Sequence, residues 1–416
     1  MVKPGYKQTT EGLIPENWEV CTWEDAGSCF SSGATPYRAI SRYYEGDIKW
    51  VSSGELNYNV ITETFEHISE EAQKKTNLTI HPANTFLMAI SGLEAAGTRG
   101  SCAILGVPAT TNQSCMAVYG TEKLDVKYLF YYYSSNGDDL AFRYCQGTKQ
   151  QSYTASIVKK LPIILPPIDE QKRIAVALSE IDKLITTLDR QLAKKRAIKQ
   201  GTMQELLTGK KRLPGFSGEW ENYHLRDLGE FLKGSGISRA ESNTGKIPAV
   251  RYGELYTHHH NYVDKFVSRI SKDVATNAKQ VFQGDILFAA SGETKEEIGK
   301  CAAIISQEAV YAGGDILIFR PSVHLNPIFM GTLLNTADVC RQRAEKGQGD
   351  AVVHIHADSL GSIKIRIPEI SEQDTIADIL FEMDKEIKLL EQKLEKYRQV
   401  KQGMMQQLLT GKIRLV

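Results

Sequence analysis

Three charged residues in the second half of the chain have the spacing of a metal-dependent nuclease site. Asp285, Glu293 and Lys295 form a D-x7-E-x-K pattern. In such a site the two carboxylates would hold Mg²⁺, and the lysine would steady the attacking hydroxide. The matching stretch of the first half, Ser91-Gly92-Leu93-Glu94, carries no such trio. Because the pattern is loose and occurs only once, a stand-alone nuclease is kept only as an alternative to the main functional prediction.

The other patterns of catalytic or metal-binding type are incomplete. Residues 92–97 and 292–300 lack the G-x-x-x-x-G-K-[ST] spacing of a phosphate-binding loop. His258-His259-His260 has no further His or Cys at ligand spacing, so we expect these histidines to face solvent. Pro166-Pro167-Ile168 lacks the acidic or amide residue and the aromatic of a base-methylating loop. The sequence therefore predicts no catalytic residue, no metal site and no cofactor in this chain.

Composition sets limits on partners and compartment. The chain has 50 basic and 50 acidic residues, so no overall basic field attracts DNA, and affinity for DNA must come from local patches or from partner proteins. Seven scattered cysteines without a C-x-x-C pair argue against a disulfide framework and a zinc site. No apolar run approaches the roughly 20 residues of a membrane span. We expect a cytoplasmic protein with no membrane partner, since the first residues also lack a signal peptide.

The elements that would position these residues are organised by an internal repeat. Residues 166–213 match residues 368–415 without a gap at a constant offset, and more than half of the positions are identical. Fainter matches precede each copy: Trp18 with Trp220, Gly54-Glu55-Leu56 with Gly253-Glu254-Leu255, Ser91-Gly92 with Ser291-Gly292, and Gly147 with Gly349. The chain is therefore a tandem duplication of a variable part followed by a constant part.

Each constant part reads as one long helix with a heptad seam. Apolar residues recur at alternating steps of four and three, and we expect them to pair the two helices: Ile174, Leu178, Ile181, Ile185, Leu188 and Leu192, and then Ile376, Leu380, Met383, Ile387, Leu390 and Leu394. Carboxylates in the first turn and the glycines Gly209 and Gly411 supply the start and stop signals. Each helix would span about 38 residues, or roughly 57 Å.

Two nearly identical seams are most economically buried against each other. The constant part of the first copy continues into Pro214-Gly215-Phe216, whereas its continuation in the second copy resembles Pro4-Gly5-Tyr6 at the other end of the chain. This suggests a circular arrangement, which requires the helices to run antiparallel. We predict an α+β protein with pseudo-twofold symmetry, in which two globular α/β domains are separated by two long antiparallel coiled-coil helices.

The predicted domains follow the repeat: a globular domain at 1–165, a helical spacer at 166–213, a second globular domain at 214–367 and a second spacer at 368–416. Both globular parts mix short strands with one helical stretch and have loops rich in Gly, Ser, Thr, Asn and Gln. Residues 146–152 and 346–350 are the clearest loops with side chains suited to base edges and phosphates. They occupy equivalent places in the two copies, which favours a functional role over ordinary solvated loops.

The whole arrangement resembles the specificity subunits of type I restriction-modification systems. The resemblance spans the chain and rests on the duplicated Glu-Gln-x-x-Ile-Ala motif at 170–175 and 372–377, and on the duplicated Leu-Leu-Thr-Gly-Lys motif at 206–210 and 408–412. It implies a non-catalytic, sequence-specific DNA-binding subunit. Each target recognition domain would read one half of a bipartite, asymmetric site in double-stranded DNA, and the helices would set the spacer between the halves.

The resemblance also implies partners. The helices would dock two modification (methyltransferase) subunits, and the complex would recruit ATP-dependent restriction subunits; S-adenosylmethionine, ATP and Mg²⁺ are expected on those partners. The expected DNA-binding residues are Ser91, Gly92, Arg99, Gly147, Thr148, Lys149, Gln150 and Gln151 in the first domain, and Ser291, Gly292, Lys295, Lys346, Gly347, Gln348, Gly349 and Asp350 in the second. Besides the nuclease, a coiled-coil adaptor without a DNA role stays open as an alternative.

Overall fold

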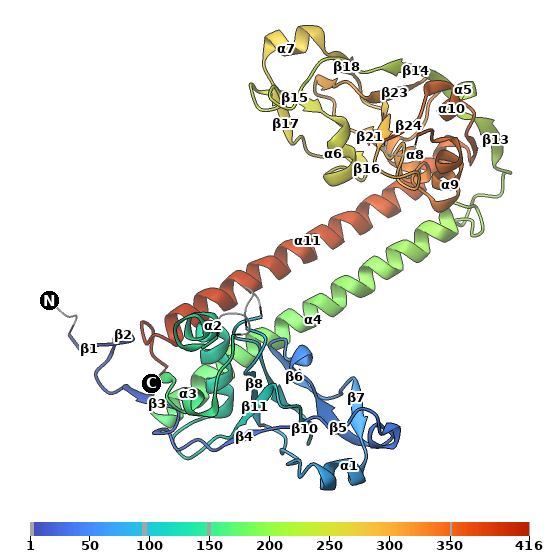
Figure 1. The fold of residues 1–416 in the computed structure, drawn as a ribbon. Helices are drawn as coiled ribbons and strands as arrows, with labels where there is room; N and C mark the ends of the chain where they lie inside the picture. Colours follow the sequence, from blue (N-terminus) through green and yellow to red (C-terminus); the bar gives the residue numbers. More distant parts are fainter. Residues whose placement is uncertain (1–3, 94–97, 148–150, 350–351, 416) are drawn as a thin grey trace. The chain divides into compact units, whose positions relative to one another are not determined.

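A computed structural model describes residues 4–93, 98–147, 151–349 and 352–415 of the chain. The chain divides into two compact units, which are described separately (Figure 1). Unit 1 comprises Met1–Asp189 and Gln392–Val416, and unit 2 comprises Arg190–Glu391. Each unit therefore holds one globular domain together with half of each long helix.

The two constant parts form the helices α4 (Ile168–Leu206) and α11 (Ile370–Leu408), each of 39 residues. Their lengths confirm the helices expected from the heptad pattern, and both run without interruption through Gly201 and Gly403. Within each unit the α4 and α11 segments lie side by side (Figure 1).

Ion pairs between α4 and α11 give the direction of the pairing. In unit 1, Lys401 contacts Asp182 at 2.6 Å, and Arg398 contacts Asp189 at 3.1 Å. The residue number rises along α4 while it falls along α11, so the helices are antiparallel. The repeat-related pairs Lys199–Asp384 and Arg196–Glu391, the latter at 2.6 Å, occur in unit 2. The predicted antiparallel pairing is therefore confirmed within each unit, and repeat-related contacts recur in both.

The globular domain of unit 1, called domain 1, is built on a five-stranded sheet. Its order is β4 (Phe30–Ser32), β11 (Cys115–Val118), β8 (Phe86–Ala89), β9 (Cys102–Leu105) and β6 (Asn59–Ile61). A smaller sheet has the order β10 (Thr110–Thr111), β5 (Ile48–Val51) and β7 (Glu66–Ile68). β3 (Glu19–Thr22) pairs with β12 (Pro162–Leu165), directly before α4. The remaining elements are β1 (Tyr6–Thr9), β2 (Gly12–Pro15), α1 (Glu70–Lys75), α2 (Val126–Tyr144), α3 (Ala155–Lys159) and the 3-10 turns η1 (Ser41–Tyr44) and η2 (Ser53–Glu55).

The globular domain of unit 2, called domain 2, repeats this topology. Its five-stranded sheet has the order β14 (Gly229–Lys233), β23 (Ile316–Pro321), β19 (Ile286–Ala289), β21 (Cys301–Ile304) and β16 (Asn261–Val263). The smaller sheet has the order β17 (Ser268–Ile270), β15 (Ile247–Val250), β22 (Val310–Ala312) and β18 (Lys279–Val281). β13 (Glu221–His224) pairs with β25 (Lys364–Ile367), and β20 (Ser291–Gly292) with β24 (Val353–His354). The helices are α5 (Leu225–Leu228), α6 (Tyr252–Thr257), α7 (Lys272–Asn277), α8 (Pro327–Leu333), α9 (Ala337–Lys346) and α10 (Ala357–Gly361).

The strand register supplies residue-by-residue equivalences between the two domains. β6 is parallel to β9, and β16 is parallel to β21, whereas the other neighbours in both five-stranded sheets are antiparallel. The central strands are buried along their whole length, as apolar strands covered on both faces should be. The predicted α+β duplication is confirmed at the level of strand order. No helix in the described ranges is both long enough and apolar enough to cross a membrane.

Candidate nucleic-acid interface

The duplicated motifs form joints that fasten the long helices to the domains. In unit 1 the indole N–H of Trp18 donates to the carboxylate of Glu170 at 3.0 Å, and Arg414 donates twice to the same carboxylate at 2.6 Å. In unit 2, Trp220 and Arg212 hold Glu372 in the same way, at 3.2 Å and at 2.7–2.8 Å. Both glutamates are buried.

Electrostatics explains how such a carboxylate tolerates burial. Removal from water raises the pKa of the Glu170 carboxyl, but the hydrogen bonds and charge of Arg414 and the hydrogen bond from Trp18 outweigh this effect. The net pKa lies below its ordinary value, so the group stays ionised. The glutamate of the duplicated motif is therefore a structural anchor.

The neighbouring glutamine completes the joint. Gln171 donates to the carbonyl oxygens of Lys123 and Pro166, both at 2.8 Å, and accepts from the backbone N–H of Asp125 at 2.9 Å. In unit 2, Gln373 makes two of these three contacts, with Pro368 and Asn326. At the far end of the helices Gly209 and Gly411 have positive φ angles and pack beside Trp220 and Trp18, respectively. The motifs thus build the scaffold that joins the helices to the domains.

The structure brings together the two loop segments that the sequence singles out in domain 1. Ser91 forms a β-bridge with Ser152, and Ser152 also bridges to Gln146 through reciprocal backbone hydrogen bonds of 3.0 Å. The backbone N–H of Leu93 donates to the carbonyl of Gln151 at 3.3 Å. Residues 91–93 and residues 151–152 therefore lie side by side, next to the end of α2.

Domain 2 has the same juxtaposition. β20, which contains Ser291 and Gly292, pairs with β24, and Gln348 exchanges backbone hydrogen bonds of 2.8 and 2.9 Å with His354. Gly147 and Gly349, at equivalent places, have φ angles of +108° and +106°. An L-residue rarely adopts this conformation, so the glycines are needed for the turn.

The expected contact residues have different surroundings. Gly92, Gly147, Gln348, Gly349 and Lys295 are exposed, and Ser91, Gln151, Lys346, Gly347 and Gly292 are half-buried. Ser291 is buried, and its hydroxyl hydrogen-bonds with His354 at 3.1 Å. Arg99 donates to Asp138 on α2 at 3.0 Å, and its charge is therefore already compensated within domain 1. Thr148, Lys149, Gln150 and Asp350 lie outside the described residues. The DNA contacts remain predictions.

The residues of the nuclease-like pattern do not form a metal site. Asp285 is buried, receives hydrogen bonds of 3.0 and 2.6 Å from Arg320, and caps the backbone N–H of Phe282. Glu293 and Lys295 are exposed and lie beyond the other end of β19. Within the residues that the structure describes, no cluster of three His, Cys, Asp or Glu side chains suited to a metal is present. Asp285 therefore has a structural partner in place of an ion.

The expectation that the three histidines face solvent is wrong for His259. This residue is buried, and its ring lies 3.7 Å from the carboxylate of Glu254. Burial and the charges of nearby Lys300, His259 and Lys199 lower the pKa of His260. The backbone carbonyl of Glu254 accepts hydrogen bonds from the backbone N–H groups of His258 and His259. The turn that contains the Gly-Glu-Leu repeat therefore holds these two histidines close to it.

The repeated Gly-Glu-Leu turn has a structural role that the sequence did not reveal. In domain 1 the Glu55 carboxylate accepts from the backbone N–H groups of Ser52 and Phe65, at 2.8 and 2.9 Å. In domain 2 the buried Glu254 carboxylate accepts from Arg251 and Ser268. The turn therefore braces adjacent loops in both domains, and its exact duplication was the available signal.

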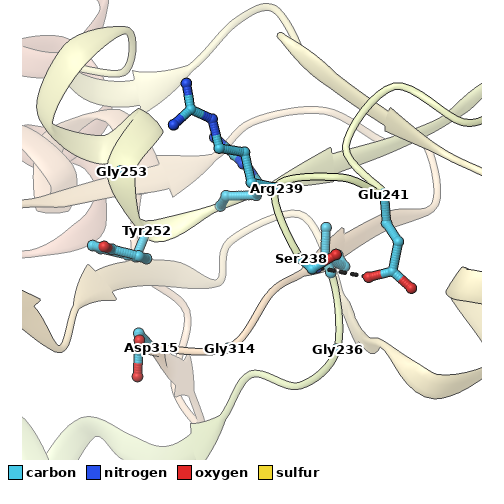
Figure 2. A pocket seen from close by; sticks show the side chains of 10 residues that line it. Gly236, Ser238, Arg239, Glu241, Tyr252, Gly253, Gly314 and Asp315 are labelled. Atoms are coloured by element: carbon cyan, nitrogen blue, oxygen red, sulfur yellow. Dashed lines mark hydrogen bonds between the residues drawn. The ribbon is translucent and has the colours of Figure 1, made fainter.

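Beside this turn, domain 2 has a cavity of about 630 Å³. Figure 2 shows Arg239, Glu241, Tyr252 and Asp315 around it. Arg239 and Glu241 lie between β14 and β15, Tyr252 begins α6, and Asp315 lies between β22 and β23. The Glu241 carboxylate accepts from the backbone N–H of Ser238 at 2.8 Å, and its pKa is lowered by hydrogen bonds from Ser238. The cavity is lined by charges of both signs.

The predicted helix-pairing residues are mostly withdrawn from solvent. Buried members are Ile174, Leu178, Ile181, Leu188, Leu192, Ile376, Leu380 and Leu394, and half-buried members are Ile185, Met383, Ile387 and Leu390. In unit 1, Ile174 and Leu178 share one core with domain 1 and with Leu408 of α11. The ends of the seam therefore serve the domain core as well as the partner helix.

The sequence of the chain is similar to a known protein family and to several characterised proteins. The family described as type I restriction modification DNA specificity domain matches twice, at residues 15–197 and 217–398. The chain is 25% identical to the type I restriction enzyme MjaVIII specificity subunit of Methanocaldococcus jannaschii, covering 97% of this chain and 94% of that protein. It is 27% identical to the EcoR124I/EcoR124II specificity subunit of Escherichia coli over 48% of this chain and 50% of that protein.

Solved structures show the same fold. The S subunit of a type I restriction-modification system from M. genitalium aligns with a TM-score of 0.62 at 15% identity, over 97% of this chain and 98% of that one. A chain from a structure on complex assembly and conformational transition of the type I R-M system aligns with a TM-score of 0.54 at 15% identity, over 96% and 99% of the two chains.

Proposed function

Because the chain belongs to the family of type I restriction-modification DNA specificity domains and carries two copies of that domain, we propose that each copy reads one half of a bipartite, asymmetric site in double-stranded DNA. The subunit recognises DNA and leaves catalysis to its partners. The proposal divides the labour between the loops, which would contact base edges, and the helices, which would set the unread spacer.

One observation carries this proposal. Two domains whose five-stranded sheets have the same strand order are fastened to α4 and α11 by the same Trp–Glu–Arg joint, yet their loops at equivalent positions differ in sequence. Recognition of two different half-sites requires the same joint to the helices in both domains but different loops, since base contacts specify sequence whereas the scaffold only positions the loops. Ser291 and His354 in domain 2 stand where domain 1 has Ser91 and Ser152, for example.

We also propose that the chain acts with partner subunits, which its charge and surface support. With 50 acidic and 50 basic residues the chain has no global field for DNA, so methyltransferase subunits docked on the helices would supply the clamp around the duplex. Exposed apolar residues on the helices, Ile198 and the repeat-related Val400, are 46% and 40% exposed and suit such docking. S-adenosylmethionine, ATP and Mg²⁺ would then be held by the modification and restriction subunits, in the cytoplasm.

Two alternatives have less support. A stand-alone nuclease would need Asp285 free to bind Mg²⁺, whereas Arg320 already neutralises its carboxylate. A coiled-coil adaptor without a DNA role would not need variable loops at matching positions on two identical mounts. Each alternative predicts an experimental result that differs from the result expected for a DNA-recognition subunit.

The test is selection from a library of random DNA duplexes by this chain in complex with its host's modification subunits, together with mapping of methyladenine in the host genome. We expect one motif with two unlike halves and an unread gap, found by both methods. A selection that returns no sequence preference, although the complex is assembled, would favour the adaptor. Cleavage of plasmid by the purified chain with Mg²⁺ would favour the nuclease.

A further inference from the structure

Two arginines occupy equivalent positions in the two domains. Gly33 directly follows β4 and Gly234 follows β14, and the register of these strands in the five-stranded sheets makes the two glycines equivalent. Counting on from the glycines without a gap, Arg38 aligns with Arg239, and both begin an Arg-Ala-x-Ser sequence. A direct comparison of their surroundings is therefore possible.

In domain 1 the guanidinium of Arg38 has partners of its own, although its side chain is 55% exposed. It forms an ion pair with Glu66, with one hydrogen bond of 2.9 Å, and stacks over the rings of Tyr44 and Trp50 at 4.4 and 5.1 Å from the ring centroids. Both contacts hold the planar group in place and compensate its charge. Arg38 is thus committed to the structure of its own domain.

Domain 2 has other residues in the places of Glu66 and Trp50. The pairing of β5 with β7 and of β15 with β17 makes Ser268 equivalent to Glu66 and Ala249 equivalent to Trp50. Among the described residues the guanidinium of Arg239 has no hydrogen-bond or ion-pair partner, and the residue is exposed at the rim of the 630 Å³ cavity. The same backbone position therefore presents an uncompensated arginine in domain 2 alone.

A second arginine faces the same cavity. Arg251 stands where domain 1 has Ser52, and only its Nε hydrogen-bonds to Glu254, at 3.3 Å, which leaves its terminal amino groups without a partner among the described residues. Glu241 and Asp315 also line the cavity. Carboxylates repel phosphate but accept hydrogen bonds from a cytosine or adenine amino group, so the mixed lining fits a base-pair edge better than the DNA backbone.

We propose that this cavity is a specificity-determining site of domain 2, in which the fork of Arg239 reads a guanine through its O6 and N7 atoms. Arg251 supports the same electron-rich edge, and one of the two carboxylates accepts from the amino group of the paired cytosine. The proposal rests on the proposed function of the chain. It also accounts for unlike half-sites, since Glu66 compensates the charge of Arg38 in domain 1, whereas Arg239 in domain 2 has no such partner among the described residues.

The experiment uses the chain in complex with the modification subunits and starts from the motif selected by the wild-type complex. Arg239→Ala should abolish the preference for guanine at one position of one half-site, which corresponds to a loss of about 5- to 150-fold in affinity for that base pair. Arg239→Lys should lose most of this discrimination too, because a lysine lacks the planar fork. The other half-site should be unchanged in both variants.

A base analogue distinguishes a contact of Arg239 with guanine from a contact with a DNA phosphate. Replacing that guanine by 7-deazaguanine removes the N7 acceptor, so the wild-type complex should bind the duplex more weakly, while Arg239→Ala should bind both duplexes alike. Arg38→Ala, and Lys272→Ala at an exposed site outside the cavity, are controls that should retain the guanine preference.

Other outcomes would overturn the proposal. If Arg239→Ala weakens binding equally on every duplex and Arg239→Lys restores it, the arginine contacts a phosphate. An unchanged motif in Arg239→Ala would remove the cavity from recognition altogether. Either result leaves the bipartite function intact, whereas a wild-type complex that selects no motif contradicts the proposed function itself. Thermal melting of each variant verifies that domain 2 remains folded.

Discussion

Arg414 donates two hydrogen bonds of 2.6 Å to the carboxylate of Glu170, although 244 residues separate them in sequence. The repeat places Arg212 on Glu372 in the same geometry. In each unit this contact joins the end of one long helix to the beginning of the other. The restriction-modification subunit therefore secures its helix pair twice, with the same chemistry.

Glu170→Gln should destabilise unit 1 by about 2 kcal/mol, because Arg414 loses its charged acceptor in a largely buried place. The folded-state pKa of Glu170 is lowered from 4.5. Its stabilisation is thus fully present above that value and is lost as the pH falls through the lowered pKa. Urea unfolding at several pH values should show the difference between the variant and the wild type shrinking in acid.

Glu180→Gln is the matched control, since Glu180 and Lys183 form an exposed pair on the same helix. Exposed pairs contribute between zero and about 1 kcal/mol. A Glu170→Gln deficit that is constant across the acid range would show that the charge of Glu170 does not carry the joint.

Two glycines near the end of α11 should respond oppositely to alanine. Gly403 lies inside the helix with open space where an added methyl group would lie, so Gly403→Ala should raise stability by roughly 0.5 to 1 kcal/mol. Gly411 has a φ of +69°, and a Cβ there would lie 2.5 Å from Cδ of Pro15. Gly411→Ala should therefore lower stability by more than about 1 kcal/mol. Chemical denaturation of both variants checks the contrast, and equal effects would contradict it.

Asp285→Asn should lower the melting temperature of domain 2 and leave no catalytic phenotype. The substitution removes the charge that compensates Arg320, although the amide can still accept from the backbone N–H of Phe282. Differential scanning calorimetry measures the first effect. Incubation of wild-type chain with plasmid and Mg²⁺ should yield no cleavage, and cleavage that disappears in Asp285→Asn would assign a metal to this residue.

The helix pair should act as a ruler for the spacer. Removal of one heptad from each helix, residues 188–194 and 390–396, preserves the pairs Asp182–Lys401 and Asp384–Lys199 on either side. At 1.5 Å per residue this shortens the pair by about 10 Å, or about 3 base pairs at 3.4 Å each. Motif selection with the shortened protein should return the same two half-sites with a spacer reduced by that amount. An unchanged spacer would refute the ruler.

A circular permutant tests the symmetry of the joints. In unit 1, Tyr6 donates to the carbonyl of Gly411 at 3.0 Å, and Arg173 donates to the carbonyl of Leu415 at 3.1 Å. Joining residue 416 to residue 1 and reopening the chain within 214–218 should preserve folding and the selected motif. Loss of cooperative unfolding in the permutant, with the wild type as reference, would contradict the circular arrangement.

Much of the architecture was accessible from the sequence because it is written in periodicity and repetition. The heptad steps predicted α4 and α11, and both globular parts contain the short strands that the sequence predicted. The same local pattern could not place His259 in the interior, because its burial depends on the turn around Glu254, which packs through a non-local contact with Ser268.

The duplication, the helix pair, the family and the choice of two loop segments in each domain all follow from the order of residues, since these features depend on spacing along the chain. That the two segments adjoin was decided by the tertiary structure. Which charged side chains are already neutralised could be learned only from the folded chain. Arg38 and Arg239 occupy the same position of the same motif. In domain 1, strands distant in sequence bring Glu66 and Trp50 to Arg38. In domain 2, Ser268 and Ala249 take the places of Glu66 and Trp50. Whether an arginine is available to a ligand depends on its neighbours in space.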